Sequence, residues 1–183
     1  MKDQKLTQDF KLSEFVDLKE ELTDYQIALL KMLAQNLQEI RNELQKYKSG
    51  MKPVCIAITS GVRTKKDYDR LKKQGYNPSQ TSDHFCGYQM VPGRPTLGAA
   101  DIRVYNCSMT MKQISLFIKQ YCEASGFYMF GQVIYEKNPK TGSEWIHLSN
   151  DPYLVLNQYI AKTIERKRYL MSTDNGKTYR TLK

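Results

Sequence analysis

Only two histidines occur in the chain, and they lie far apart in the sequence, at His84 and His147. A carboxylate accompanies each of them, because Asp101 follows the first and Glu144 stands three residues before the second. Two imidazoles and one carboxylate form a good ligand set for a catalytic zinc ion, whose fourth position stays open for water. If both histidines act at one site, the fold must bring His84, Asp101 and His147 together from distant segments.

The length of 183 residues and the hydrophobic fraction of 40% predict one domain with a real core. We expect this domain to span residues 1–167, including a helical lead-in, and a hairpin or tail to follow over 168–183. No apolar run approaches the roughly 20 residues of a membrane helix. The polar start of the chain leads into no apolar signal core, so a cytoplasmic location is expected unless something other than a cleaved signal releases the protein.

The net charge of +9 favours an anionic partner. Nucleic acid is one candidate, but no nucleic-acid-binding motif of recognised spacing occurs, so this partner is the weaker prediction. The acidic polymers of a bacterial cell wall are another candidate, and the plain alternative is a solvated basic surface. None of these patterns indicates an oligomeric state.

The four cysteines do not form a CxxC pair, which argues against a structural zinc ribbon. Cys86 stands two residues after His84 and is an alternative metal ligand. Oxygen and nitrogen donors suit a water-activating site better than a thiolate does. Cys55 and Cys122 lie in apolar stretches and are expected to pack in the core.

Hydrophobic periodicity predicts several helices and strands. The clearest helix spans 23–47, where Thr23 and Gln26 have capping-box spacing and leucine or isoleucine recurs every three to four residues. A loop over 76–98 contains His84, and loops of this length are usually functional or disordered. The other expected elements are strands over 54–60, 99–105, 127–136 and 144–148, helices over 65–74, 110–124 and from 151 to about 167, a short helix around 12–18, and a hairpin turn at 174–176.

Four short motifs stand in order along the chain: Ser60-Gly61-Val62-Arg63, Ser82-Asp83-His84, Gly98-Ala99-Ala100-Asp101 and Glu144-Trp145-Ile146-His147. Each is weak alone, but four of them in this order make a specific pattern. They resemble the motifs of the zinc D,D-peptidases of the M15 family, the group that includes D-Ala-D-Ala carboxypeptidases and phage L-alanyl-D-glutamate endolysins. The opening Phe10-Lys11-Leu12-Ser13-Glu14-Phe15 is similar to that of the phage and bacterial branch, and the resemblance covers about residues 10–150.

The resemblance implies an α+β fold of the hedgehog/DD-peptidase type, with a small, mostly antiparallel sheet and helices packed on one face. It implies a zinc metallopeptidase of the carboxypeptidase or endopeptidase type, which hydrolyses D-amino-acid-containing cross-link peptides of peptidoglycan. A phage enzyme released by lysis or carried in the virion would fit. The alternative is a non-catalytic structural or binding protein of the virion on the same zinc-site fold.

The resemblance also implies a role for each residue of the metal site. His84, Asp101 and His147 would bind the zinc ion, although nickel, cobalt or manganese also suits this donor set. Glu144 would be the general base. In a regular strand Trp145 and His147 share one face, so Glu144 would have to swing toward the metal from the start of the strand.

Three further side chains are implied to meet the substrate. Arg63 would hold the scissile carbonyl oxygen as negative charge develops, or grip a substrate carboxylate. Its plain alternative is a cation on a surface turn. Ser82 and Trp145 would contact the peptide.

One departure from the family pattern affects the loop that holds His84. Sixteen residues separate His84 from Asp101, more than the family usually has. Residues 88–97 therefore look like an insertion, which would form a flap over the cleft, a partner contact, or a site reshaped for a non-catalytic role.

Overall fold

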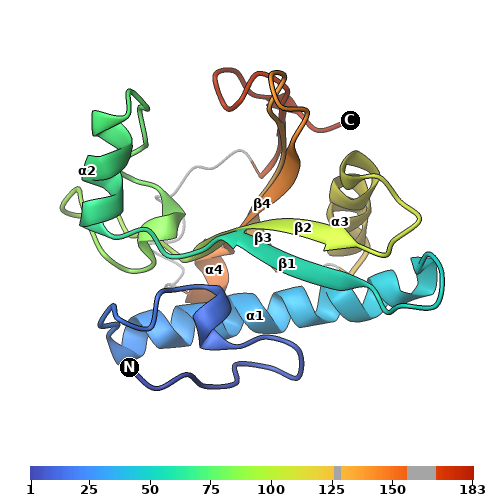
Figure 1. Ribbon diagram of the computed structural model, residues 1–183, viewed down its shortest axis with the longest axis horizontal. Helices are drawn as coiled ribbons and strands as arrows, with labels where there is room; N and C mark the ends of the chain where they lie inside the picture. Colours follow the sequence, from blue (N-terminus) through green and yellow to red (C-terminus); the bar gives the residue numbers. More distant parts are fainter. Residues whose placement is uncertain (126–128, 156–167) are drawn as a thin grey trace.

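The computed structural model describes residues 1–125, 129–155 and 168–183, and it has the expected α+β fold (Figure 1). Six strands form one sheet in the order β1-β2-β4-β3-β5-β6. Every pairing is antiparallel except that of β3 with β5. The elements are η1 (Leu12–Glu14), α1 (Asp24–Leu44), η2 (Gln45–Tyr47), β1 (Cys55–Ser60), α2 (Lys65–Lys73), η3 (Asp83–Phe85), β2 (Ala99–Tyr105), α3 (Met111–Ser125), β3 (Phe130–Lys137), β4 (Glu144–Asn150), α4 (Pro152–Val155), β5 (Tyr169–Ser172) and β6 (Arg180–Thr181).

Helix α1 begins where the capping box predicts. The side chain of Thr23 accepts a hydrogen bond from the backbone of Gln26, and the Gln26 side chain accepts one from the Thr23 backbone. Although α1 has 21 residues, no helix in the described part of the chain is both long and apolar enough to cross a membrane. Its predicted apolar stripe is fully buried: Leu30, Leu33, Leu37, Ile40 and Leu44.

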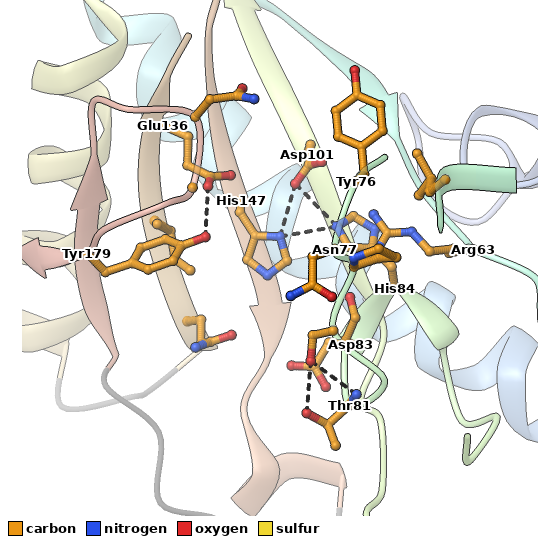
Figure 2. A pocket seen from close by; sticks show the side chains of 18 of the residues that line it. Arg63, Tyr76, Asn77, Thr81, Asp83, His84, Asp101, Glu136, His147 and Tyr179 are labelled. Carbon is orange, nitrogen blue, oxygen red and sulfur yellow. Dashed lines mark hydrogen bonds and ion pairs between the residues drawn. The ribbon is translucent and has the colours of Figure 1, made fainter. Parts of the chain in front are cut away.

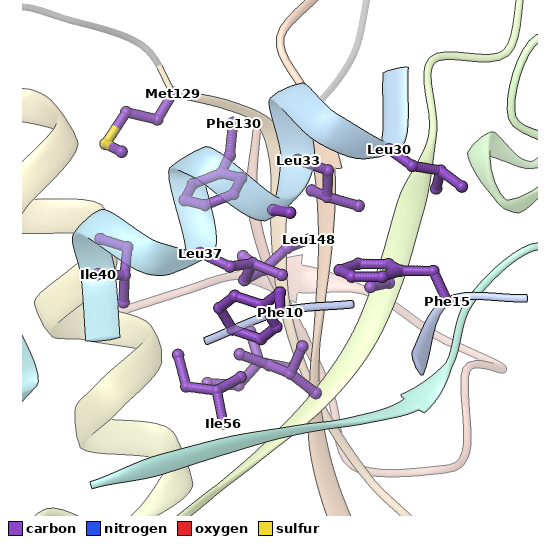
Figure 3. Close-up of a cluster of buried hydrophobic side chains, with 14 of the residues drawn as sticks. Phe10, Phe15, Leu30, Leu33, Leu37, Ile40, Ile56, Met129, Phe130 and Leu148 are labelled. Carbon is purple, nitrogen blue, oxygen red and sulfur yellow. The ribbon is translucent and has the colours of Figure 1, made fainter. Parts of the chain in front are cut away.

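The sheet presents one face to a single hydrophobic core. Side chains alternate between the two faces of a strand, and Ile102, Ile146 and Leu148 point from β2 and β4 into the cluster that also contains the buried residues of α1 and α3. Leu148 and Leu37 of α1 belong to this cluster, part of which Figure 3 shows. The opposite face of β2, β3 and β4 is therefore free of this core, and it is there that polar side chains gather.

The N-terminal lead-in belongs to the same core. Phe10 and Phe15 are almost fully buried, with ring centroids 6.1 Å apart, in the cluster shown in Figure 3. Between them η1 forms a single 3-10 turn, shorter than the predicted helix around 12–18. The backbone carbonyl of Phe15 then accepts a hydrogen bond from Val62, so the lead-in is tied to the segment that follows β1.

The C-terminal segment contributes two strands to the sheet. The hairpin turn forms as predicted, with positive φ at Asn175 and Gly176. β5 pairs with β3, and Leu182 is fully buried, so the expected hairpin extends the sheet of the main domain. The helix predicted from 151 begins as α4, where Asp151 accepts a hydrogen bond from the Tyr153 backbone, and its continuation over 156–167 lies outside the described residues.

Candidate metal centre

Three elements bring His84, Asp101 and His147 to one point (Figure 2). Asp101 and His147 are Cα partners across β2 and β4, on the face away from the core. His84 lies in η3, a turn of the loop that connects α2 to β2. The predicted convergence of two histidines and one aspartate is therefore present in the structure.

The donor atoms of the three residues form a nearly equilateral triangle. His84 Nε2 stands 3.2 Å from His147 Nδ1 and 3.3 Å from Asp101 Oδ1, and His147 Nδ1 stands 3.0 Å from Asp101 Oδ1. In a tetrahedral zinc site with bonds of about 2.0–2.1 Å, neighbouring ligand atoms are about 3.3 Å apart. The residues present thus fit a metal ion of this kind and leave one coordination position toward solvent.

Gly61 fixes the orientation of the first imidazole. Its backbone carbonyl stands 2.7 Å from His84 Nδ1, which makes that nitrogen the protonated one and leaves Nε2 free to bind a metal. A Cβ at Gly61 would lie 2.0 Å from the Phe15 carbonyl oxygen. Only glycine allows this close approach, which explains its place in the motif Ser60-Gly61-Val62-Arg63.

The electrostatics of the triangle favour a cation. Burial alone would raise the pKa of Asp101, but the neighbouring His84 and His147 outweigh this effect and hold the pKa well below its ordinary value. The side chains of His84, His147 and Asp101 are only 4%, 12% and 18% exposed. A buried, ionised carboxylate between two imidazoles requires a proton or a metal ion among these acceptors.

The triangle opens into a cleft of about 1370 Å³, larger than the roughly 300–1,000 Å³ of a typical small-molecule site. Strands β2, β3 and β4 form its floor, the segment after α2 one wall, and the C-terminal turn another. All three predicted substrate-contacting residues line it: Arg63, Ser82 and Trp145.

Arg63 lies beside His84 at the edge of the cleft (Figure 2). Its backbone N–H donates to the His84 carbonyl, so the motif segment that holds the arginine also touches the metal-site turn. Burial lowers the pKa of its guanidinium, although an arginine remains charged. Among the described residues, the guanidinium has no hydrogen-bond or ion-pair partner, which leaves its donors available to a ligand.

Glu144 is not brought to the metal centre. It lies at the start of β4 on the face opposite His147, because residues three apart in a regular strand point to opposite faces. Its carboxylate forms an ion pair of 3.1 Å with Lys137, its Cα partner on β3, and with burial it raises the pKa of Tyr135 to about 12. The swing toward the metal that the general-base role requires is not seen.

A different glutamate, which is not predicted from the sequence, occupies the cleft. Glu136 of β3 is the Cα partner of Trp145 and lines the cleft on the side of His147 away from His84 (Figure 2). Trp145 Nε1 donates to its Oε2 at 2.7 Å, and the Tyr179 hydroxyl donates to its Oε1 at 3.1 Å. Burial raises the pKa of Glu136. The alternation of side chains along 130–137 indicates which residues share a face with Glu136, but only the strand pairing shows that this face lines the cleft.

Cys86 is excluded as a ligand by its direction. Its thiol contacts the Gln26 carbonyl oxygen of α1 at 3.6 Å, and it is fully buried in the core rather than in the cleft. Burial raises its pKa to about 12, so the thiolate form is rare. Of the two cysteines expected in the core, Cys122 is buried but Cys55 is exposed at the start of β1.

The apparent insertion over 88–97 is folded back onto the metal-site turn. Asp83 Oδ1 accepts a hydrogen bond from the Leu97 backbone, and the Asp83 carbonyl accepts one from Gly98. Arg94 and Pro95, near the end of the insertion, line the cleft. This part of the insertion therefore contributes to the wall of the cleft.

Comparison with known proteins adds no relative. No protein-family model matches the chain, and neither a curated protein nor a solved structure matches it. What this site does must therefore be inferred from the donors, the cleft and the motifs of the chain itself.

Proposed function

We propose that this protein is a zinc-dependent peptidase that hydrolyses D-amino-acid-containing bonds in the cross-link peptides of peptidoglycan. The observation that carries the proposal is the triangle of His84 Nε2, Asp101 Oδ1 and His147 Nδ1, with sides of 3.0–3.3 Å, at the floor of a large cleft. A zinc ion bound there would lower the pKa of a water toward neutrality and polarise a substrate carbonyl.

The guanidinium of Arg63, which has no hydrogen-bond or ion-pair partner among the described residues, supports a substrate with developing or full negative charge. Its planar fork can hold a carbonyl oxygen as it becomes an oxyanion, or grip a carboxylate in two parallel hydrogen bonds. Both groups occur in a peptide that is cleaved near its C-terminal end. The position of Arg63 beside His84 suits either use.

The substrate class is supported by the four ordered motifs and by the charge of the chain. The motifs resemble those of the M15 peptidases, and the net charge of +9 suits the acidic polymers of a bacterial wall. A cleft with room for several residues of a peptide is consistent with an extended substrate. Delivery as a phage lysis enzyme or as part of the virion belongs to the same proposal.

Zymography on gels that contain bacterial cell wall tests the proposal. We expect a cleared band that EDTA abolishes and added zinc restores, together with new peptide ends in mass spectra of the digested muropeptides. A matched lane of EDTA-treated protein without added zinc is the control. Stoichiometric zinc without any clearing or new peptide ends would contradict the peptidase and favour a non-catalytic virion component.

A further inference from the structure

Three carboxylates of the described residues line the cleft: Asp83, Asp101 and Glu136. Asp101 belongs to the donor triangle. Asp83 is almost fully buried, and it accepts the Leu97 backbone hydrogen bond that folds the insertion back. Glu136 alone is both outside the donor triangle and free of a backbone-holding role, so it is the carboxylate available for chemistry in the cleft.

The partners of Glu136 orient its carboxylate without neutralising it. Both donors, the indole of Trp145 and the hydroxyl of Tyr179, are uncharged. A carboxylate has about four acceptor positions, so two donors leave room for a water. Glu144, by contrast, forms an ion pair with the ammonium of Lys137, so its carboxylate already has a charged partner outside the cleft.

The position of Glu136 is close to the donor triangle but not within it. Its charge interacts with both His147 and Asp101, yet it is absent from the group of ligand atoms that lie within 4.8 Å of one another. Figure 2 shows it beside His147, facing the same space. A carboxylate beside the ligands but outside their set does not compete for the metal, and a base in this reaction needs such a place next to the attacking water.

From this geometry we infer that Glu136 is the general base of the reaction and that Tyr179, from the C-terminal hairpin, is its positioning residue; the inference rests on the proposed peptidase function. One O–H bond of the attacking water breaks, its proton goes to Glu136, and its oxygen bonds to the peptide carbonyl carbon. When the C–N bond breaks, Glu136 returns the proton to the leaving nitrogen. The second proton of the water remains with the products, which at neutral pH are a carboxylate and an ammonium, and Glu136 is regenerated.

The C-terminal strands place a hydrogen-bond donor beside Glu136. Tyr179 lies between β5 and β6, and the backbone of Asn175 donates to the Lys137 carbonyl at the end of β3. The turn thus brings the Tyr179 hydroxyl to Glu136. Without this turn, Glu136 would keep only the Trp145 indole of its two hydrogen-bond donors among the described residues.

Paired variants of the two glutamates test the catalytic assignment. We expect Glu136→Gln to lower kcat by about 10²–10⁴-fold, with unchanged zinc stoichiometry and little change in KM. Glu123→Gln, on the exposed surface of α3, controls for the loss of one negative charge. Glu144→Gln tests the competing assignment of Glu144 as the base. If Glu144→Gln lowers kcat more than Glu136→Gln does, the inference is overturned.

A readout independent of turnover is available because Trp145 is the only tryptophan of the chain. Its single indole N–H resonance reports the hydrogen bond to Glu136 in the metal-free protein. We expect Glu136→Gln and Tyr179→Phe to shift this resonance, and Tyr105→Phe to leave it in place. Tyr105 is a matched control because both tyrosines are 48% exposed. An indole resonance unaffected by Glu136→Gln would overturn the arrangement.

The positioning role of Tyr179 predicts a specific kinetic split. Tyr179→Phe should lower kcat roughly tenfold with unchanged KM and zinc content, because a misaligned base slows the reaction but not substrate binding. Unchanged kcat would refute the role of Tyr179. A wild-type protein that binds zinc but cleaves no wall peptide would refute the proposed function itself, whereas an active Glu136→Gln variant would refute only the present inference.

Discussion

The two faces of the central sheet differ in what they contribute, although they share the same strands. On β4, Ile146 and Leu148 are fully buried in the core beneath α1, whereas Trp145 and His147 line the cleft. Along the strand, residues that pack in the core therefore alternate with residues that line the cleft. The fold and the candidate site can therefore be perturbed separately by substitutions one residue apart.

The largest expected effect is on the cleft face. His147→Ala removes one of three ligands, so we expect zinc content to fall from about one ion per chain to near zero and wall hydrolysis to disappear. The metal-free variant should unfold at nearly the same denaturant concentration as metal-free wild type, because His147 lies outside the hydrophobic core. Elemental analysis and denaturant titration measure both quantities. Retained zinc would show that the triangle is not the metal site.

On the core face, Leu148→Ala should have the opposite profile. Its side chain is fully buried, and deleting it is expected to reduce the free energy of unfolding by about 2–5 kcal/mol. Folded protein should still bind zinc. Ser149→Ala is the matched control, because the buried Ser149 hydroxyl has no hydrogen-bond partner among the described residues and its loss should cost little. Equal destabilisation by both changes would contradict the separation of the two faces.

A smaller effect is expected at the edge of the cleft. Arg63→Lys keeps the charge but replaces a planar fork with a point charge, so kcat/KM should fall about tenfold, equivalent to about 1.4 kcal/mol. Arg70→Lys is the control, since Arg70 is exposed on α2 and pairs with Asp67. Steady-state kinetics on a wall-derived peptide compares the two. If Arg63→Lys leaves kcat/KM unchanged, the simpler interpretation of Arg63 as a cation on a surface turn holds.

The smallest effect concerns Cys86, which is near His84 in sequence but packed on the core side. Burial raises the pKa of its thiol to about 12, so the thiol stays protonated at pH 8 and ionises only as the pH approaches 12. Iodoacetamide at pH 8 should modify the exposed Cys55 and leave Cys86 intact, as mass spectrometry of peptides will show. Ready modification of Cys86 that zinc prevents would identify it as a ligand after all.

Local patterns predicted much of this structure. The capping box and leucine stripe predicted α1, and alternation predicted that Trp145 and His147 share a face. These features depend on residues a few positions apart, whose relative directions are set by the helix or strand itself. The three residues that could hold a metal ion are predicted because histidine is rare in this chain and because short motifs surround each donor.

The choice between two glutamates shows where local patterns stop. The motif Glu144-Trp145-Ile146-His147 favours Glu144 as the general base. In a regular strand, however, a spacing of three residues places Glu144 on the face opposite His147, where it pairs with Lys137. Glu136 reaches the cleft because β3 pairs with β4 in the register that sets it opposite Trp145. No pattern within either strand specifies that register.

The sequence by itself determined the donor types and the two-residue alternation that separates core from cleft. Only the tertiary structure decided that Glu136 rather than Glu144 faces the site, and that Tyr179 comes back from the C-terminus to hold it. The reason is physical. Direction along a strand is a local property of the backbone, whereas strand order, register and the parallel addition of β5 depend on packing between distant segments.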